Sequence, residues 1–104
     1  MSKADTTAIT LSNSTPVKLS TSPENINLRC NWVNNCRVYA FTASTANPPA
    51  PAVDAAIYLP PLAGSSLGGD DVSFGEPFDA YVFAAPIDAS KPFSGRVVYN
   101  KWDN

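Results

Sequence analysis

The chain has 104 residues, a length that fits one domain with a modest hydrophobic core. Seven basic and nine acidic residues give a net charge of −2, and charged residues make up only 15% of the chain. The basic residues are scattered, which argues against nucleic acid as the main partner, and no apolar run is long enough to predict a transmembrane helix.

The composition also argues against a helical or a disordered protein. Ten of the 104 residues are proline, roughly twice the usual frequency of about 5%. Proline breaks helix interiors, and the low Lys and Glu content removes strong helix formers. A hydrophobic content of 44% can offset the conformational entropy lost on ordering the chain. The composition therefore favours a folded domain built from strands.

Two short strands are predicted near the N-terminus. Thr7–Ser12 alternates apolar and hydroxyl residues, and Val17–Ser20 resumes the alternation after the turn sequence Asn13–Pro16. The first strand could pair with the second as a hairpin, or with the central strands of the sheet. The pattern alone leaves both pairings open.

The segment from Asn25 to Ser44 predicts two strands folded back on each other at Asn34-Asn35. Period-two alternation places four side chains of the first strand on one face, namely those of Ile26, Leu28, Cys30 and Trp32. We therefore interpret Trp32 as a core residue behind this hairpin, and expect the hairpin itself to form the core of the domain.

The two cysteines of the chain, Cys30 and Cys36, lie in this predicted hairpin. With a two-residue turn at Asn34-Asn35 the two thiols are not opposite each other, whereas a loop centred on Val33 would bring them opposite. The start of the chain lacks the apolar segment of a signal peptide, which favours reduced thiols. We expect free, buried thiols, with a disulfide as the alternative.

A proline-rich arm at residues 46–52 follows, and its prolines exclude it from the interior of a sheet. Val53–Leu59 could form one helical turn or a strand, and residues 60–70 read as a loop. Further strands are predicted at Asp70–Gly75, Ala80–Ala84 and Gly95–Trp102.

About seven short strand candidates, separated by turn signals, predict an all-β fold. We expect a single small antiparallel β-sandwich or barrel over residues 1–104, with a long proline-rich loop. Loops of that length are often functional or form interfaces.

The sequence offers no candidate catalytic residue. Histidine, the commonest general base and metal ligand, is absent, and no nucleophile elbow or phosphate-binding loop is present. The carboxylates around Asp70, Asp71, Glu76 and Asp79 do not have the spacing of an EF-hand. We expect no enzymatic activity, no cofactor and no metal site.

Candidate interface residues lie outside the hairpin. Trp102 stands near the end of the chain, where burial in a core is not assured, so an aromatic anchor for a partner is a plausible role. The arm could strap onto a neighbouring molecule. The candidate interface residues are Pro48, Pro49, Pro51, Tyr58 and Trp102.

The layout resembles the small β-sandwich virion proteins of tailed bacteriophages. The resemblance lies in the Met-Ser start, the alternating Ile9-Thr10-Leu11 and Val17-Lys18-Leu19, the segment Ile26–Phe41 and the aromatic strand Asp79–Ala84. It implies a structural role, as a protein that decorates or cements a capsid or forms part of a head fibre or tail.

The resulting hypothesis is a non-enzymatic virion protein, made in the host cytoplasm without a signal peptide and located in the virion. Its partners would be capsid or other virion proteins, with the chain itself a homo-oligomer or present in many copies on a lattice, and with no nucleic acid or membrane partner. The alternative is a glycan-binding or host-adhesion module that uses exposed aromatic residues.

Overall fold

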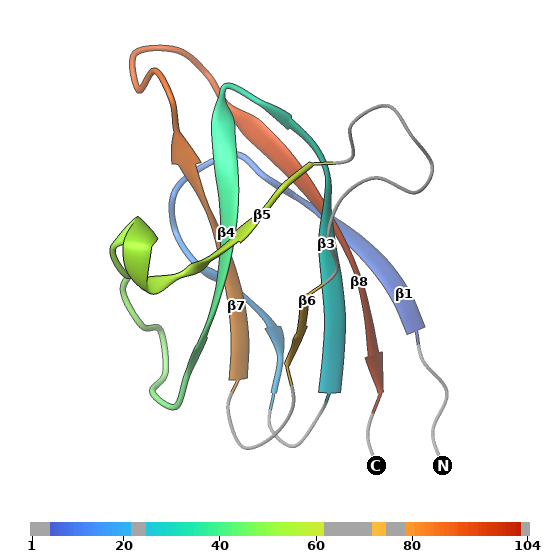
Figure 1. Cartoon of the computed structure of the whole chain (residues 1–104). Helices are drawn as coiled ribbons and strands as arrows, with labels where there is room; N and C mark the ends of the chain where they lie inside the picture. Colours follow the sequence, from blue (N-terminus) through green and yellow to red (C-terminus); the bar gives the residue numbers. More distant parts are fainter. Residues whose placement is uncertain (1–4, 22–24, 62–71, 75–78, 103–104) are drawn as a thin grey trace.

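The computed structural model describes residues 5–21, 25–61, 72–74 and 79–102. Eight strands and one short 3-10 turn lie within these ranges (Figure 1). They are β1 (Asp5–Leu11), β2 (Val17–Ser20), β3 (Asn25–Asn34), β4 (Cys36–Ala43), η1 (Val53–Ala55), β5 (Ile57–Leu59), β6 (Val72–Phe74), β7 (Asp79–Pro86) and β8 (Ser94–Trp102).

The strands form two four-stranded antiparallel sheets with the orders β1-β8-β3-β6 and β2-β7-β4-β5. We call them sheet A and sheet B. The first four strands thus pair with the last four in reverse order, β1 with β8, β2 with β7, β3 with β6 and β4 with β5. Two packed sheets of eight strands in this order form a jelly roll. The predicted all-β sandwich is confirmed, and it is an open sandwich rather than a barrel.

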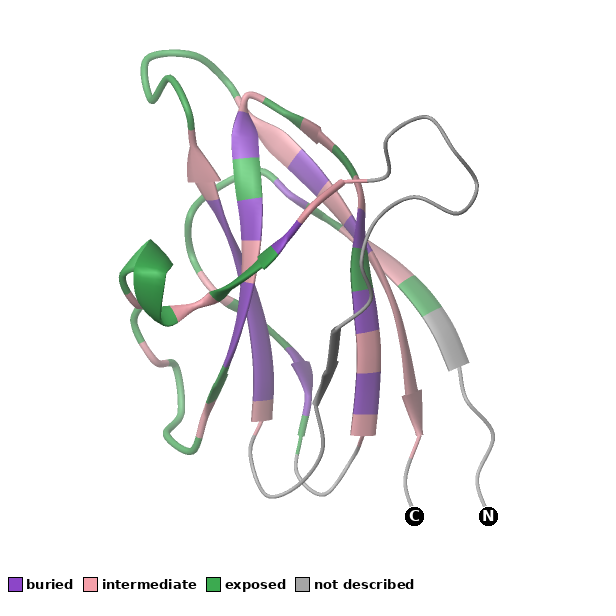
Figure 2. Cartoon of the chain, in the orientation of Figure 1, coloured by how far each residue is buried: buried purple, intermediate pink, exposed green. Residues whose placement is uncertain are grey.

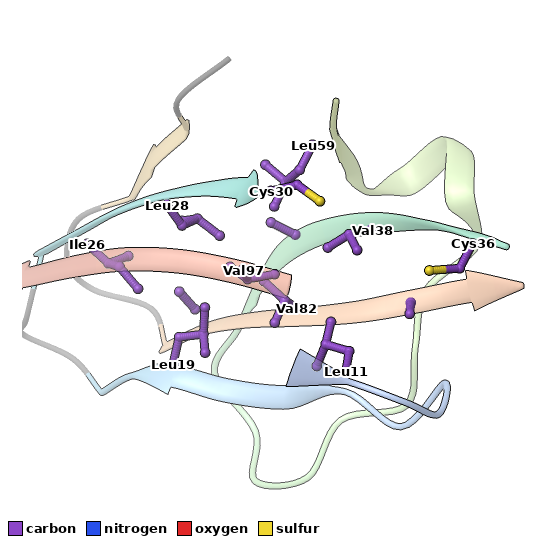
Figure 3. Packing of buried hydrophobic residues seen from close by; sticks show 13 residues of the cluster. Leu11, Leu19, Ile26, Leu28, Cys30, Cys36, Val38, Leu59, Val82 and Val97 are labelled. Atoms are coloured by element: carbon purple, nitrogen blue, oxygen red, sulfur yellow. The ribbon is translucent and has the colours of Figure 1, made fainter. Parts of the chain in front are cut away.

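The core lies between the two sheets, and Figure 2 shows buried positions alternating along β3, whereas β7 is buried without interruption from Ala80 to Ala84. Both sheets contribute inward side chains, shown close up in Figure 3. The buried cluster comprises Leu11, Leu19, Ile26, Leu28, Cys30, Cys36, Val38, Ala40, Leu59, Ala80, Ala84, Val82 and Val97. Burial of these apolar side chains is the main driving force for bringing the sheets together.

The predicted hairpin between Asn25 and Ser44 is wrong. Both strands exist, but β3 belongs to sheet A and β4 to sheet B, so the two face each other across the core. Only Asn35 separates them, and an antiparallel hairpin connection needs about two residues. The chain instead crosses from one sheet to the other at Asn35, whose φ of 60° lies in the left-handed region that asparagine tolerates.

The first strand also pairs differently from both alternatives left open by the sequence. β1 pairs with β8, with Asp5 opposite Lys101 and Leu11 opposite Gly95, while β2 lies in the other sheet. Sequence patterning defines the inward face of such a strand, but it does not identify a partner some 90 residues away along the chain.

The remaining predicted elements lie close to observed ones. For Val53–Leu59 the sequence predicted either one helical turn or a strand. The segment contains both, since η1 is followed after one residue by β5. Pro61 forms a parallel bridge with Cys30, so the chain after β5 has already reached sheet A. Residues 62–70 of the predicted loop lie outside the described residues.

Candidate functional site

The structure separates the five candidate interface residues onto opposite sides of the sandwich. Tyr58 lies on the outer face of sheet B, opposite Tyr39, and the arm with Pro48, Pro49 and Pro51 runs beside the same sheet. Trp102 lies at the end of β8 in sheet A, opposite Asn25. A single interface that included all five residues would have to span both outer faces of the sandwich.

The outer face of sheet B carries a continuous row of aromatic rings. Tyr39 and Phe83 stack with centroids 5.5 Å apart, Phe41 and Tyr81 stack at 5.4 Å, and Phe41 meets Phe83 edge-on at 5.8 Å. Tyr58 extends the row at 5.6 Å from Tyr39. We call the five rings joined by these contacts the aromatic row; they are those of Tyr39, Phe41, Tyr58, Tyr81 and Phe83.

Most of the aromatic row is covered by the chain itself. Phe41, Tyr81 and Phe83 are buried although they point away from the core between the sheets. The proline-rich arm begins and ends beside them: the Tyr81 hydroxyl donates a 3.4 Å hydrogen bond to the Thr45 carbonyl, and Ala56 packs against the cluster. Thr45 and Ala56, the residues that flank this part of the chain, thus lie against the outer side of sheet B.

A pocket of about 190 Å³ opens where the arm leaves the sheet. Its lining combines the turn before β2, the first arm residues and one ring of the aromatic row, namely Thr15, Pro16, Lys18, Ala46, Asn47, Pro48 and Tyr81. The only charged group in this lining, the Lys18 ammonium, lies 4.0 Å from the Asp79 carboxylate. The pocket thus offers little unsatisfied charge to a ligand.

The arm prolines differ in exposure. Pro48 and Pro51 are half-buried, whereas Pro49 is exposed. Beyond the arm, Val53, Ile57 and Tyr58 are exposed apolar residues along the β5 edge of sheet B. Scattered exposed apolar residues are common on monomeric proteins and need no partner.

The outer face of sheet A is organised differently, and its main feature is Trp32. The sequence predicted a buried Trp32, but the side chain is 42% exposed. The cause is a β-bulge: Cys30 pairs with Val97 and Trp32 with the next residue back, Arg96, so Asn31 is an extra residue on β3. The bulge reverses the alternation, and Val33 instead packs against the core.

Register places Trp102 on the same outer face as Trp32. Val97 points into the core, so Val98, Asn100 and Trp102 point outward by the strand alternation. Trp102 lies opposite Asn25, seven residues before Trp32 on the neighbouring strand. At about 3.4 Å per strand residue, and allowing for the bulge, the two indoles are separated by about 20 Å along the sheet.

We call the outward residues of the described part of sheet A the Trp/Arg face. Its members are Ala8, Thr10, Asn25, Asn27, Arg29, Trp32, Arg96, Val98, Asn100 and Trp102. Its described residues include two tryptophans and two arginines, and no lysine, aspartate or glutamate. Protein interfaces are enriched in aromatic residues and arginine and depleted in these three residue types.

Both cysteines are free and buried. The Cys30 thiol donates to the Trp32 carbonyl at 3.6 Å, and the Cys36 thiol donates to the Ser94 carbonyl at 3.3 Å. Burial raises the pKa of Cys30 to about 11, with the nearby Cys36 adding to the rise, and burial also raises the pKa of Cys36. Thiols held neutral in this way are poor nucleophiles and poor metal ligands.

Other site types find little support in the part of the chain that the structure describes. No cluster of three or more His, Cys, Asp or Glu side chains there could hold a metal ion. The described residues also form no helix long and apolar enough to cross a bilayer.

Comparison with protein-family models, curated proteins and solved structures found no match to the chain.

The residues that sequence reasoning missed are Trp32, Arg29 and Arg96. Arg29 and Arg96 occupy outward positions in strands that were correctly located, so their common face could have been found once β3 and β8 were known to pair. Trp32 carried no such signal, because a bulge at Asn31 leaves no clear mark in the amino-acid sequence.

Proposed function

We propose that the chain is a non-enzymatic structural protein of a bacteriophage virion, which decorates or cements the capsid and docks through the Trp/Arg face. The single observation that carries the docking site is the gathering of Trp32, Trp102, Arg29 and Arg96 on one outer sheet face. Tryptophan and arginine dominate the energetic hot spots of protein interfaces.

Three further features support a structural role. The chain has no histidine, its two thiols are buried, and the described residues hold no cluster of metal ligands. The jelly roll is an architecture used by viral capsid domains, although it also occurs in lectins and cupins, so the fold alone does not assign a function. The resemblance to phage head-associated proteins also favours a structural role, as does the interface-like composition of the Trp/Arg face.

The test is binding of the purified chain to capsids that lack it. We expect the Trp32→Ala and Trp102→Ala variants to lose at least about tenfold in affinity, as truncated hot-spot residues do. Tyr58→Ala is the matched control, since it removes an exposed aromatic ring from the opposite sheet. Equal losses in all three variants would show that this face does not determine docking, and no binding by the unmodified chain would reject the capsid role.

A glycan-binding or host-adhesion role is the second candidate, favoured by two tryptophans on one sheet face with asparagine positions between them. Asn25, Asn27 and Asn100 lie between or beside the tryptophans in the β3–β8 register. Sugar rings stack on indoles and their hydroxyls pair with amides. Saccharide binding on a glycan array that is lost in Trp102→Ala, together with absent capsid binding, would select this role.

A further inference from the structure

We propose that β1 pairs with β1 of a second copy of the chain, so that the two copies of sheet A join edge to edge into one eight-stranded sheet. The contact is made chiefly by backbone hydrogen bonds along a free sheet edge, as in other cases of strand addition. This inference goes beyond the proposed function and does not depend on it.

Four of the described strands have a neighbour on one side only, namely β1 and β6 in sheet A and β2 and β5 in sheet B. An unpaired edge presents a row of amide and carbonyl groups with which another strand can pair. Proteins usually protect such edges by making the strand short or by placing prolines, lysines or β-bulges in it. An edge without these features is open to a further strand.

Three of the four edges carry such protection. β5 and β6 are described as strands of three residues each, and Pro60 follows β5 directly. β2 has four residues, contains Lys18 and has a register shift between Lys18 and Ser20. As described, none of these three strands offers a long, regular edge.

β1 is the exception among the four. It has seven residues, contains no proline, lysine or arginine, and pairs with β8 over its whole length without a register shift. Its described side chains, from Thr7 to Leu11, are all uncharged, so a second copy of this segment meets no like charge. A long, regular edge strand of this kind readily pairs with another chain.

The sequence of β1 is compatible with pairing to itself. A two-fold axis perpendicular to the sheet at Ala8, the middle residue of β1, makes the two strands antiparallel and pairs all seven residues. Residues directly opposite each other then lie on the same face of the joined sheet. Ile9 of one copy lies opposite Thr7 of the other, and both are β-branched residues that favour strands.

The contact also covers apolar surface at the open edge. Ile9 packs against the core but is only half-buried in the single chain. A strand of the second copy beside it removes more of this side chain from water, which adds a hydrophobic contribution to the backbone hydrogen bonds.

The symmetry of the contact limits the assembly to two copies. Pairing β1 with β1 uses the free β1 edge of both copies, and the joined sheet then ends in β6 on either side. Because β6 is described as a three-residue strand, it offers little edge to a further copy. The two-fold axis also makes the Trp/Arg faces of both copies point in the same direction.

The oligomeric state of the full chain tests this contact. Sedimentation velocity over a range of protein concentrations is expected to show an equilibrium between a monomer and a species of twice its mass. Ala8→Lys combined with Thr10→Lys places like charges opposite each other across the two-fold axis, and is expected to raise the dimer dissociation constant at least about tenfold. Both positions point away from the core, so the fold should accept lysine at each.

Thr42→Lys combined with Ser44→Lys is the matched control. It adds the same two charges, also two residues apart, at exposed positions at the end of β4 and just beyond it in sheet B. The dimer dissociation constant of this variant is expected to stay within about twofold of that of the unmodified chain.

Ala8→Cys tests the position of the axis without a change of charge. Directly opposite Cβ atoms of an antiparallel pair are about 4.5–5.5 Å apart, close to the spacing of about 3.5–4.5 Å in a disulfide. Mild oxidation is therefore expected to give a covalent dimer on a non-reducing gel. Thr42→Cys is the control and is expected to give none, while the native Cys30 and Cys36 are buried and should not compete.

A chain that is monomeric at every concentration would overturn the inference. The same holds for a dimer that the two double-lysine variants weaken equally, and for a covalent product that forms as readily from Thr42→Cys as from Ala8→Cys. Growth beyond two copies would contradict the closed two-fold contact. None of these measurements involves a capsid, so their outcome is separate from that of the proposed virion role.

Discussion

Asn35 joins the two sheets at the point where the chain crosses the sandwich. Besides adopting a φ of 60°, it holds the β7–β8 loop: its side-chain amide donates to the Asp88 carbonyl at 2.9 Å, and its side-chain oxygen accepts from the Asp88 amide at 3.0 Å. Its backbone carbonyl accepts from the Ile87 amide at 2.9 Å. One residue therefore fixes both the crossing and the adjacent loop.

Replacing Asn35 by alanine is expected to destabilise the fold by about 2–3 kcal/mol, from the left-handed backbone conformation and the lost side-chain hydrogen bonds together. Asn35→Gly keeps the backbone freedom and loses only the amide, so its loss is expected to be smaller. Urea unfolding measures both changes.

Asn34→Ala is the control for this pair of variants, since Asn34 is exposed and lies directly before Asn35. Its unfolding midpoint is expected to stay close to that of the unmodified chain. If Asn34→Ala and Asn35→Ala were equally destabilising, the clamp on the β7–β8 loop would not be the source of the effect.

At the scale of strands, Gly95 sets how closely the two sheets approach near the crossing. A Cβ atom at this position would come within 2.8 Å of Val38 Cγ2 from the opposite sheet, and 3.5 Å from the Cys36 Sγ. Val38 is fully buried and β-branched, so it has little freedom to move aside.

Gly95→Ala is therefore expected to destabilise the protein by about 1–3 kcal/mol through overpacking. Adding Val38→Ala removes the clashing methyl group and should recover part of this loss. A double-mutant cycle from thermal or urea unfolding measures the coupling. Purely additive losses would mean that the two residues do not compete for the same space.

The strands themselves could be predicted from the sequence better than their partners. The residue pattern located β2 and most of β7 and β8. The alternation in β8 reflects burial on one side, whereas β7 is buried on both sides from Ala80 to Ala84. The pattern failed where an extra residue enters a strand: the bulge at Asn31 turned Trp32 outward, and a shift between Lys18 and Ser20 in β2 leaves both Leu19 and Ser20 buried. The residue pattern also predicted a hairpin from β3 and β4. Alternation within each strand does not show whether two consecutive strands pair in one sheet or face each other across the core.

On the scale of the whole molecule, the two outer faces are expected to serve different purposes. Thr45 and Ala56, which flank the arm, contact the aromatic row on sheet B, whereas the Trp/Arg face is on the other side of the sandwich. The sequence predicted interface roles for the arm and for Trp102. It could not show that they lie on opposite faces, because that depends on which sheet each strand joins.

This separation can be tested by replacing Pro48, Pro49 and Pro51 together with serine. The triple variant is expected to be less stable by about 1–3 kcal/mol, because a freer arm has more conformational entropy to lose on folding. If the Trp/Arg face is the docking face as proposed, capsid binding of the folded variant should be unchanged, since that face lies on the other sheet. Loss of binding without loss of folded protein would instead make the arm an anchor in its own right.

The reverse-order pairing of the eight strands also governs how the chain reaches its folded state. Among the described strand pairs, only β4 and β5 are consecutive in the sequence, and Asp5 must find Lys101 near the other end of the chain. Such long-range pairings give slow folding, with times of milliseconds to seconds, which stopped-flow refolding from urea would measure. During synthesis, β1 to β3 have no sheet neighbour until β6 to β8 have been made. The two sheets are therefore expected to form only after β8 has been synthesised.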